Sequence, residues 1–179
     1  RDSVASRGRG DVYKRQVYGL TKGQSSPTTK LGVVTSSTPF GKMENEADPL
    51  ELYLTIGVSF IASGFSGNPR QLAGLIKEGM NHQGFSMVHV QSPCVTYNDT
   101  YELLKGKPKE GIEPLVWDIP EDHEPNDKAA AYNLIQKRGL PIGVIYKDES
   151  RPSLDQRIED IWSKAKEQTA QQLIDAYEF

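Results

Sequence analysis

A short polar segment framed by two glycines lies near the start of the chain. It is Val17-Tyr18-Gly19-Leu20-Thr21-Lys22-Gly23-Gln24, and Ser26-Pro27-Thr28-Thr29 follows it closely. Glycine lets backbone N–H groups approach an anion closely, and a threonine hydroxyl and a lysine ammonium can complete the shell around it. The same residues also suit an ordinary turn with a solvated lysine. The segment is therefore a candidate anion-binding loop.

Cys94 is the only cysteine, and it follows an expected strand over Phe85–Gln91. Cys94 could have no chemical role and simply be a buried thiol that packs like a small apolar side chain. A nucleophilic thiol would need a nearby base, and His89 lies five residues earlier. Because successive side chains of a strand alternate between faces, this odd spacing points the two groups apart. The spacing thus disfavours acyl-transfer chemistry.

Two other histidines and an acidic run offer weaker candidates for a metal site. His82 is expected at a helix end, and His123 lies within Glu121-Asp122-His123-Glu124. Neither histidine has a second ligand at a suitable spacing, so both are interpreted as surface residues. The acidic run could hold a cation loosely, but runs of charge are usually solvated.

Alternating helices and strands must position these groups. Asp48 and Pro49 open a helix through about Ile56, and Val58–Ser63 is a short buried strand. A second helix starts at Asn68, buries one face and closes at Gly84. That face is Leu72, Leu75, Ile76 and Met80. With the strand Phe85–Gln91, this order predicts a parallel sheet covered on both faces, with ligands beyond the carboxyl ends of its strands.

The second half of the chain is expected to hold fewer elements. Residues 98–126 predict a long functional or interfacial loop, and Asn126 caps a helix through Arg138. Ile142–Tyr146 is an expected strand at a sheet edge after Pro141. Ser153 and Gln156 open a long C-terminal helix with an apolar stripe, interpreted as core or as a contact between subunits. The stripe is Leu154, Ile158, Ile161, Trp162 and Ala165.

Residues 1–16 differ in composition from the rest of the chain. They hold five basic and two acidic residues, and removing them changes the formal net charge from −3 to −6. The segment resembles translated sequencing-adapter sequence and is treated as non-native, the alternative being a basic arm that binds nucleic acid. The acidic remainder gives no reason to expect a nucleic-acid partner. No apolar run suits a membrane span, and the single cysteine excludes a disulfide framework, so a cytoplasmic protein is expected.

Four separate runs of the chain occur together, and in this order, in one enzyme family. They are Val17–Thr29, Ser37–Gly41, Asp48–Leu50 and Ser92–Asn98. The first resembles the end of the thiamine-diphosphate motif in the beta subunit of 2-oxoacid:ferredoxin oxidoreductases, the 2-oxoglutarate branch in particular. The similarity covers roughly residues 17–146. Several motifs in register are far more specific than any one of them.

The resemblance implies roles for individual residues. Lys22 would be the catalytic-site lysine, where an ammonium aimed at a distal carboxylate selects 2-oxoglutarate over pyruvate. The Val17 backbone carbonyl would ligate Mg²⁺, and Cys94 would ligate a four-iron four-sulfur cluster. Leu20 would pack against the cofactor rings. The residues implied to bind thiamine diphosphate are Val17, Tyr18, Gly19, Leu20, Thr21, Lys22, Gly23 and Gln24.

Part of each implied ligand set is missing from the chain. In the family, a Gly-Asp-Gly element would precede Val17, and its aspartate binds Mg²⁺. Three further cysteines, which ligate the cluster, would also precede Val17. Arg15 stands where the family has an asparagine that ligates Mg²⁺. Mg²⁺ needs a nearly octahedral oxygen shell, and the cluster needs about four thiolates. We therefore expect that this polypeptide alone holds neither, and that the missing motifs lie upstream in the reading frame.

The resemblance also implies an activity and an architecture. The parent enzyme converts a 2-oxoacid, CoA and oxidised ferredoxin to acyl-CoA, carbon dioxide and reduced ferredoxin, with an alpha subunit that binds the thiamine pyrimidine. The implied architecture is α/β: a partial thiamine-diphosphate-binding fold with a parallel sheet, helices on both faces and a long C-terminal helix. Residues 17–98 would form the partial domain, and residues 99–179 a loop and helical extension of it.

Three alternatives stay open. The chain could be a non-catalytic fragment or interaction module without cofactor. It could also belong to a thiamine enzyme without ferredoxin, which the Ser-Pro-Cys run at Cys94 disfavours. Pyruvate or another 2-oxoacid could be the substrate. The enzymatic interpretation requires that the glycine-framed segment and Cys94 project from neighbouring strand ends toward one site.

Overall fold

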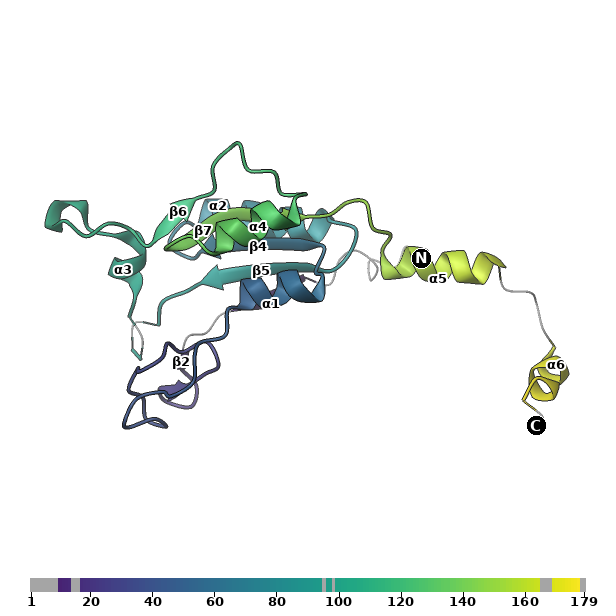
Figure 1. The fold of residues 1–179 in the computed structure, drawn as a ribbon, viewed down its shortest axis with the longest axis horizontal. Coiled ribbons are helices and arrows are strands. Elements are labelled where there is room, and N and C mark those ends of the chain that lie inside the picture. The colour runs from purple at the N-terminus through teal and green to yellow at the C-terminus, as the bar shows by residue number, and fades with distance from the viewer. Residues whose placement is uncertain (1–9, 14–16, 95, 98, 165–168, 178–179) are drawn as a thin grey trace.

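The chain folds into an α/β body with a helical arm at its C-terminal end (Figure 1). The computed structural model describes residues 10–13, 17–94, 96–97, 99–164 and 169–177. The elements in chain order are β1 (Gly10–Tyr13), β2 (Val17–Tyr18), β3 (Gln24–Ser25), α1 (Pro49–Ile56), β4 (Phe60–Phe65), α2 (Pro69–Asn81), β5 (Ser86–Gln91), α3 (Tyr101–Lys105), η2 (Pro108–Glu110), β6 (Val116–Asp118), α4 (Lys128–Ile135), β7 (Leu140–Lys147), α5 (Leu154–Lys164) and α6 (Ala170–Asp175).

Two parallel units form the main sheet. Its strand order is β1-β5-β4-β7-β6, where β1, β5 and β4 run parallel to one another and β6 runs parallel to β7. The two units meet at β4 and β7, which pair antiparallel. The predicted α/β fold with a largely parallel sheet is therefore confirmed, with one antiparallel junction that the alternation of elements did not predict.

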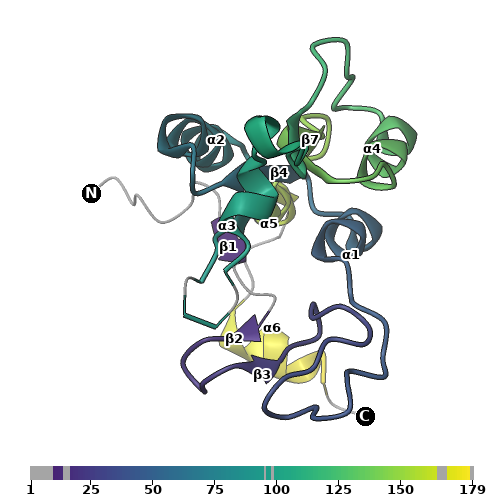
Figure 2. The ribbon, with the colours of Figure 1, turned by 90° about the vertical axis from the view of Figure 1, so that its left-hand side faces the viewer.

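Helices cover both faces of this sheet, as predicted. Figure 2 shows α2 on one side and α1 with α4 on the other. The β4-α2-β5 and β6-α4-β7 crossovers step in the same direction across the sheet, but the strands of one run antiparallel to the strands of the other. Because each crossover is right-handed, their helices are placed on opposite faces. One core cluster joins α1 and α4 to Ile61 and Met87, and a second joins α2 to Phe60 and Val88.

The predicted helix starts are confirmed by their hydrogen bonds. The Asp48 carboxylate accepts from the Leu50 and Glu51 amides at the start of α1, and the Asn68 side chain accepts from the Gln71 amide at the start of α2. Gly57 ends α1 in a left-handed conformation. Strand β4 begins two residues later than predicted, and β5 one residue later.

Several sequence predictions for the body were wrong. The expected loop over residues 98–126 contains α3, η2 and β6, which are too short to give a periodic signal. Strand β7 lies inside the sheet between β4 and β6, although Pro141 suggested an edge. Helix α4 is capped by Asp127, one residue after the predicted cap. Met80, predicted to be buried, is exposed.

Strand β1 lies within residues 1–16, the segment predicted to be non-native. It pairs parallel with β5 at the edge of the sheet, in the register Gly10 to Ser86 and Tyr13 to His89. An element is therefore present where none was expected. The non-native origin of residues 1–16 stays a prediction, and residues 1–9 and 14–16 lie outside the described ones.

The C-terminal arm consists of α5 and α6, which extend away from the sheet (Figure 1). At the start of α5, the Ser153 amide donates to the Gln156 side-chain oxygen and the Gln156 amide donates to the Ser153 hydroxyl, which confirms the predicted start. No residue of α5 is buried, and Trp162 is 72% exposed. The interpretation of the apolar stripe as core was wrong, and its role as a contact between subunits stays a prediction; Ala165 lies outside the described residues. Among the described residues, no helix has the length and apolar character to cross a bilayer.

Candidate functional site

The glycine-framed segment folds into a tight antiparallel hairpin. Val17 pairs with Ser25 and Tyr18 with Gln24, and the Gly23 amide donates to the Tyr18 carbonyl at 2.8 Å. Lys22 has a φ of 65°, the one positive value of a non-glycine residue in the described part of the chain. A lysine in this left-handed region costs roughly 1–2 kcal/mol. The hairpin therefore fixes Lys22 in an unfavourable conformation at its tip.

The hairpin packs directly against the loop that follows β5. A Cβ atom at Gly19 would lie 3.9 Å from the Cys94 Sγ atom, and one at Gly23 would lie 3.4 Å from the Tyr97 ring. The hairpin backbone therefore lies against these two side chains, and the positive φ of 83° at Gly23 favours glycine there. The candidate anion-binding loop and the Cys94 thiol are thus neighbours beyond the carboxyl end of β5. That both project toward one site stays a prediction.

The tip of the hairpin is open to solvent. Leu20 is 88% exposed, and Thr21, Lys22 and Gln24 are also exposed, whereas Tyr18 and Gly19 are partly buried. Leu20 therefore has the orientation expected of a residue that contacts something outside this chain. The polar side chains of the tip can meet an anion without first breaking a buried contact.

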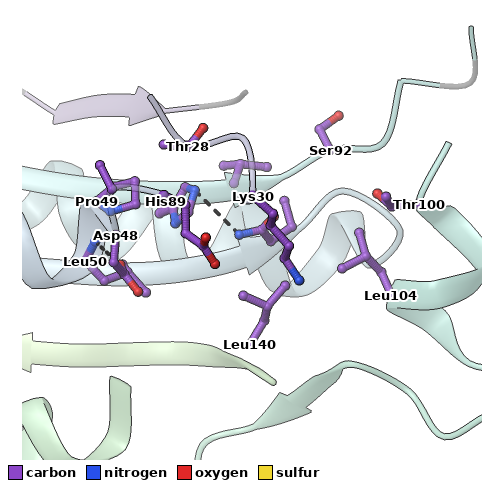
Figure 3. A pocket seen from close by; sticks show the side chains of 14 residues that line it. Thr28, Lys30, Asp48, Pro49, Leu50, His89, Ser92, Thr100, Leu104 and Leu140 are labelled. Atoms are coloured by element: carbon purple, nitrogen blue, oxygen red, sulfur yellow. Dashed lines mark hydrogen bonds between the residues drawn. The ribbon is translucent and has the colours of Figure 1, made fainter. Parts of the chain in front are cut away.

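A cavity of about 170 Å³ lies behind the hairpin, between the end of β5 and the first turn of α1 (Figure 3). Lys30 and Glu46 bring opposite charges to its wall, and His89 reaches it from β5. The lining residues are Thr28, Lys30, Glu46, Ala47, Asp48, Pro49, Leu50, His89, Val90, Gln91, Ser92, Thr100, Leu104 and Leu140. A smaller cavity of about 150 Å³ adjoins the hairpin through Val17 and shares Lys30, Thr100 and Leu104 with the first.

Two groups in the larger cavity have shifted pKa values. Burial lowers the pKa of His89 to about 4, so its imidazole is neutral at pH 7. Its Nε2 atom lies 3.5 Å from the Gln91 Nε2 atom. Hydrogen bonds from the Glu46 and Leu31 amides lower the pKa of the Glu46 carboxyl, with smaller contributions from Lys30 and Lys42. The lining of the cavity thus includes both a neutral imidazole and an ionised carboxylate.

The other histidines have structural roles. His82 is buried, with Nε2 2.9 Å from the Ser59 hydroxyl, so its interpretation as a surface residue was wrong. Burial, followed by the charge of Lys147, lowers the pKa of His82. His123 is half-buried and donates to the Ile145 carbonyl at 2.8 Å. No group of three metal-ligating side chains occurs among the described residues, the acidic run at His123 included.

The described residues fit the implied cofactors only in part. An exposed ammonium and hydroxyl on a glycine-framed hairpin suit a diphosphate. A Mg²⁺ shell does not fit, because the Val17 carbonyl has no carboxylate cluster beside it in the described chain. A four-iron cluster does not fit either, since Cys94 is the single cysteine of the chain.

Sequence reasoning missed the residues behind the hairpin. The structure brings Thr28, Lys30 and Glu46 to the cavity and buries Lys42 in the same segment, although none of these residues had been given a role. The Ser-Pro-Thr-Thr run directly after the hairpin was the available signal. This run did not show which side chains would face the cavity, because residues 26–47 have no regular secondary structure in which a periodicity could appear.

Comparison with known proteins gives one consistent relationship. Residues 94–163 match the family described as the C-terminal region of the pyruvate ferredoxin oxidoreductase beta subunit. The chain is 34% identical over 154 residues to 2-oxoacid:ferredoxin oxidoreductase subunit beta of Saccharolobus solfataricus, which covers 82% of this chain and 50% of that protein. It is 32% identical over 106 residues to 2-oxoglutarate oxidoreductase subunit KorB of Mycobacterium tuberculosis, covering 59% and 28%.

The fold agrees with the sequence comparison. The structure matches 2-oxoglutarate:ferredoxin oxidoreductase from Magnetococcus marinus, solved with 2-oxoglutarate, coenzyme A and succinyl-CoA bound, with a TM-score of 0.79 and 33% identity. The match covers 98% of this chain and 61% of that chain. The chain spans about half the length of the first curated relatives it matches. In both sequence and fold, the chain is a relative of the beta subunits of 2-oxoacid:ferredoxin oxidoreductases.

Proposed function

We propose that the chain forms the C-terminal part of a beta subunit in a complex that oxidises a 2-oxoacid to acyl-CoA and passes the electrons to ferredoxin. The observation that carries this proposal is the contact between the glycine-framed hairpin and the loop after β5, with Gly19 against Cys94. In this family, as the resemblance implies, one of these two segments binds thiamine diphosphate and the other ligates the cluster. Their contact supports one shared site.

The residues of this chain would bind and orient rather than carry the chemistry. Thiamine diphosphate, when bound, supplies the carbon nucleophile and the electron sink for decarboxylation. Gly19, Thr21 and Gly23 would shape the loop around the diphosphate, and exposed Leu20 would pack against the rings and exclude water. Cys94 would contribute one of the four thiolates of a cluster, and the Val17 carbonyl one of the Mg²⁺ ligands; the remaining ligands would come from outside this chain.

The proposed substrate is 2-oxoglutarate. Lys22 presents its ammonium at the exposed tip of the hairpin, where it can pair with the distal carboxylate of a dicarboxylic 2-oxoacid. Relatives named for 2-oxoglutarate, and a similar structure that contains it, support this choice. Pyruvate has no second carboxylate, so the same ammonium would add little to its binding.

The proposed partners are an alpha subunit, ferredoxin and CoA. Several large apolar side chains around the hairpin are exposed, which is unusual for a surface that stays in water. They are Leu20, Leu31, Val34, Phe40 and Met43. An alpha subunit that covers this surface would bring the pyrimidine-binding half of the site to the hairpin. We propose the cytoplasm as the location, on the argument from the single cysteine.

A second candidate function is a non-catalytic interaction module. It is favoured by one observation, the incomplete ligand sets for Mg²⁺ and for the cluster in this chain. The two candidates differ in whether the chain, assembled with an alpha subunit, binds thiamine diphosphate. Absence of any cofactor binding in the assembled complex would favour the interaction module. Turnover by an iron-free complex would instead favour a thiamine enzyme that does not use ferredoxin.

The substrate proposal predicts an unequal effect of Lys22→Ala. In the assembled complex, kcat/KM for 2-oxoglutarate should fall at least about tenfold more than kcat/KM for pyruvate, which corresponds to roughly 1.4 kcal/mol of lost charge pairing. Lys109→Ala, which removes an exposed lysine from η2, is the matched control and should leave both values unchanged. Equal losses for the two substrates would remove the selectivity role of Lys22.

A further inference from the structure

The segment that links the hairpin to α1, residues 26–47, buries polar side chains and exposes apolar ones. Its buried side chains are those of Ser26, Thr29 and Lys42. Its largest exposed apolar side chains are those of Leu31, Val34, Phe40 and Met43. Apolar burial therefore cannot hold this segment in one conformation. Directional polar contacts must do so, and the longest of the buried polar side chains is Lys42.

The Lys42 ammonium lies at the centre of the segment. It is part of a side chain only 7% exposed, and it donates to the carbonyls of Pro27 at 3.0 Å, Thr29 at 2.9 Å and Asn45 at 3.3 Å. A lysine ammonium has three N–H donors, so this arrangement uses all of them. One cation thus ties the Pro27–Thr29 turn to the far end of the segment.

The Lys42 backbone extends the same connection. Its amide donates to the Val33 carbonyl at 3.0 Å, and its carbonyl accepts from the Gly32 amide at 2.8 Å. Next to this pairing, Thr35 and Thr38 form a bridge that presents Ser36 and Ser37. The contacts of Lys42 therefore hold both ends of the 30–42 loop and the short turn at its tip.

That short turn supports the hairpin. The Ser36 amide donates to the Gly23 carbonyl at 3.2 Å, and the Ser37 hydroxyl accepts from the Ser25 amide at 3.0 Å. On the other side, the Pro27–Thr29 turn carries Thr28 into the larger cavity. Any movement of Lys42 would therefore be transmitted to the hairpin and to the cavity wall at once.

The positive charge of Lys42 is compensated by a nearby carboxylate that does not bond to it directly. Its three acceptors are neutral carbonyls, and the ionised Glu46 carboxylate lies close enough for the Lys42 charge to lower the pKa of its carboxyl. A buried cation is costly unless it is hydrogen-bonded and compensated. The contacts of Lys42 meet both conditions, because three carbonyls accept from its ammonium and a carboxylate lies nearby.

We propose that Lys42 is a positioning residue for the cofactor site, whose ammonium fixes the conformation of the glycine-framed hairpin and of the Thr28 turn. The assignment of the hairpin to thiamine diphosphate rests on the proposed function; the mechanical connection from Lys42 to the hairpin does not. Two separate measurements therefore test the two steps.

Hydrogen exchange on the chain tests the connection. Lys42→Met keeps an unbranched side chain one atom shorter and removes all three donors, so the amides of residues 23–47 should exchange at least about tenfold faster, while those of β4 and β5 should not change. Lys77→Met, an exposed lysine of α2, is the matched control and should change neither set. Equal acceleration in β4 and β5 would show a general loss of stability and overturn the positioning role.

Cofactor binding in the assembled complex tests the consequence. Lys42→Met should raise the Kd for thiamine diphosphate at least about tenfold, with a much smaller fall in kcat at saturating cofactor, and Lys42→Arg should recover most of the affinity. A purely structural role would lower the fraction of active enzyme and leave Kd unchanged. If the unmodified complex binds no thiamine diphosphate, the proposed function fails, and the exchange experiment still decides whether Lys42 positions the hairpin.

A measurement on the unmodified chain covers the case in which Lys42→Met does not fold. A lysine ammonium bound to three carbonyls should give a slowly exchanging NH₃⁺ resonance in a ¹H–¹⁵N spectrum, with cross-peaks to Pro27 and Thr29. A spectrum in which every lysine ammonium exchanges rapidly would overturn the proposal.

Discussion

The sheet with its helices and the segment 26–47 are stabilised in opposite ways. In the sheet, Phe60, Ile61 and Ile145 are fully buried, and apolar clusters fill both faces. In the segment, apolar side chains such as Phe40 are exposed, and the ammonium of Lys42 is buried instead. The two regions meet at the larger cavity, which is lined by His89 of β5 together with Lys30 and Glu46 of the segment.

The two kinds of contact contribute differently to the free energy of unfolding and to the precise placement of atoms. Apolar burial is roughly proportional to area and has no direction, so it stabilises the sheet without fixing one atom against another. Hydrogen bonds are directional, and leaving a buried donor unpaired is costly. The segment therefore gains little stability from its contacts but a defined shape, which is what a site for an anionic cofactor requires.

The largest expected effect is a difference in the free energy of unfolding between two phenylalanine substitutions, one in each region. Phe60→Ala removes a fully buried ring that packs against α2 and the His82 ring, and it should lower the free energy of unfolding by about 3–5 kcal/mol. Phe40→Ala removes a ring that is fully exposed, so unfolding should change by less than about 0.5 kcal/mol. Denaturant unfolding of both variants measures the difference.

The same pair tests the assignment of the exposed surface. If Phe40 faces an alpha subunit, Phe40→Ala should weaken the complex while leaving the isolated chain as stable as before. A Phe40→Ala chain that unfolds as easily as Phe60→Ala would contradict the division into two regions, because it would place Phe40 in a core.

The boundary between the regions predicts a pH dependence. The pKa of His89 is about 4 in the folded chain and about 6.5 in an unfolded one, so the unfolded state binds the proton more tightly. Stability should therefore fall as the pH drops through the window from 6.5 to 4, by about 3 kcal/mol in total. His89→Gln should flatten the unfolding free energy across that window.

His123→Gln is the matched control for the pH experiment, because it removes a half-buried histidine from another loop. The lowered pKa values of Glu46, Asp148 and Glu149 also reduce stability as the pH falls, but mainly at the acid end of this window and below it, because the ordinary pKa values of these carboxyls are 4.5 for Glu and 3.8 for Asp. His82 has a lowered pKa as well and contributes in the same direction. A His89→Gln chain that keeps the full pH dependence would assign the effect to His82.

Much of the body could be predicted because its signals are local. Asp48 with Pro49, and Asn68 with Pro69, mark helix starts through hydrogen bonds that lie within one turn. The antiparallel junction of β4 and β7 could not be predicted, because it depends on contacts between residues about eighty positions apart. Burial of His82 was missed for the same reason, since its hydrogen-bond partner Ser59 lies on a different element.

For the site, the sequence indicated that the hairpin would lie near the loop after β5. It did not indicate which residues hold the hairpin in place. The contact of Gly19 with Cys94 follows from the rule that ligands gather beyond the carboxyl ends of parallel strands. Lys42 could not be identified, because a lysine after a glycine in an irregular segment suggests a solvated side chain. Its three acceptors are backbone carbonyls, which carry no signature in the sequence.

The smallest expected effect lies within the segment itself, at two glycines with positive φ. Gly41 has a φ of 93°, and a Cβ atom there would lie 2.9 Å from the Gly32 carbonyl oxygen. Gly32 has a φ of 79° with no atom within 4 Å of its Cβ position. Gly32→Ala should cost about 1 kcal/mol from backbone strain alone, and Gly41→Ala about 2 kcal/mol, because the backbone contact adds to the same strain.

Because the segment opens independently of the sheet in this view, the cost should appear in local hydrogen exchange rather than in global unfolding. Amides of residues 26–47 should lose protection roughly fivefold in Gly32→Ala and roughly thirtyfold in Gly41→Ala, while β4 stays unchanged. Gly41→Ala displaces the residue next to Lys42, so it should also loosen the hairpin amides near Gly23, whereas Gly32→Ala should not. An equal loss of amide protection in β4 would mean that the segment and the sheet unfold as one unit. The two regions would then differ in the kind of contact that stabilises them but not in how easily they open.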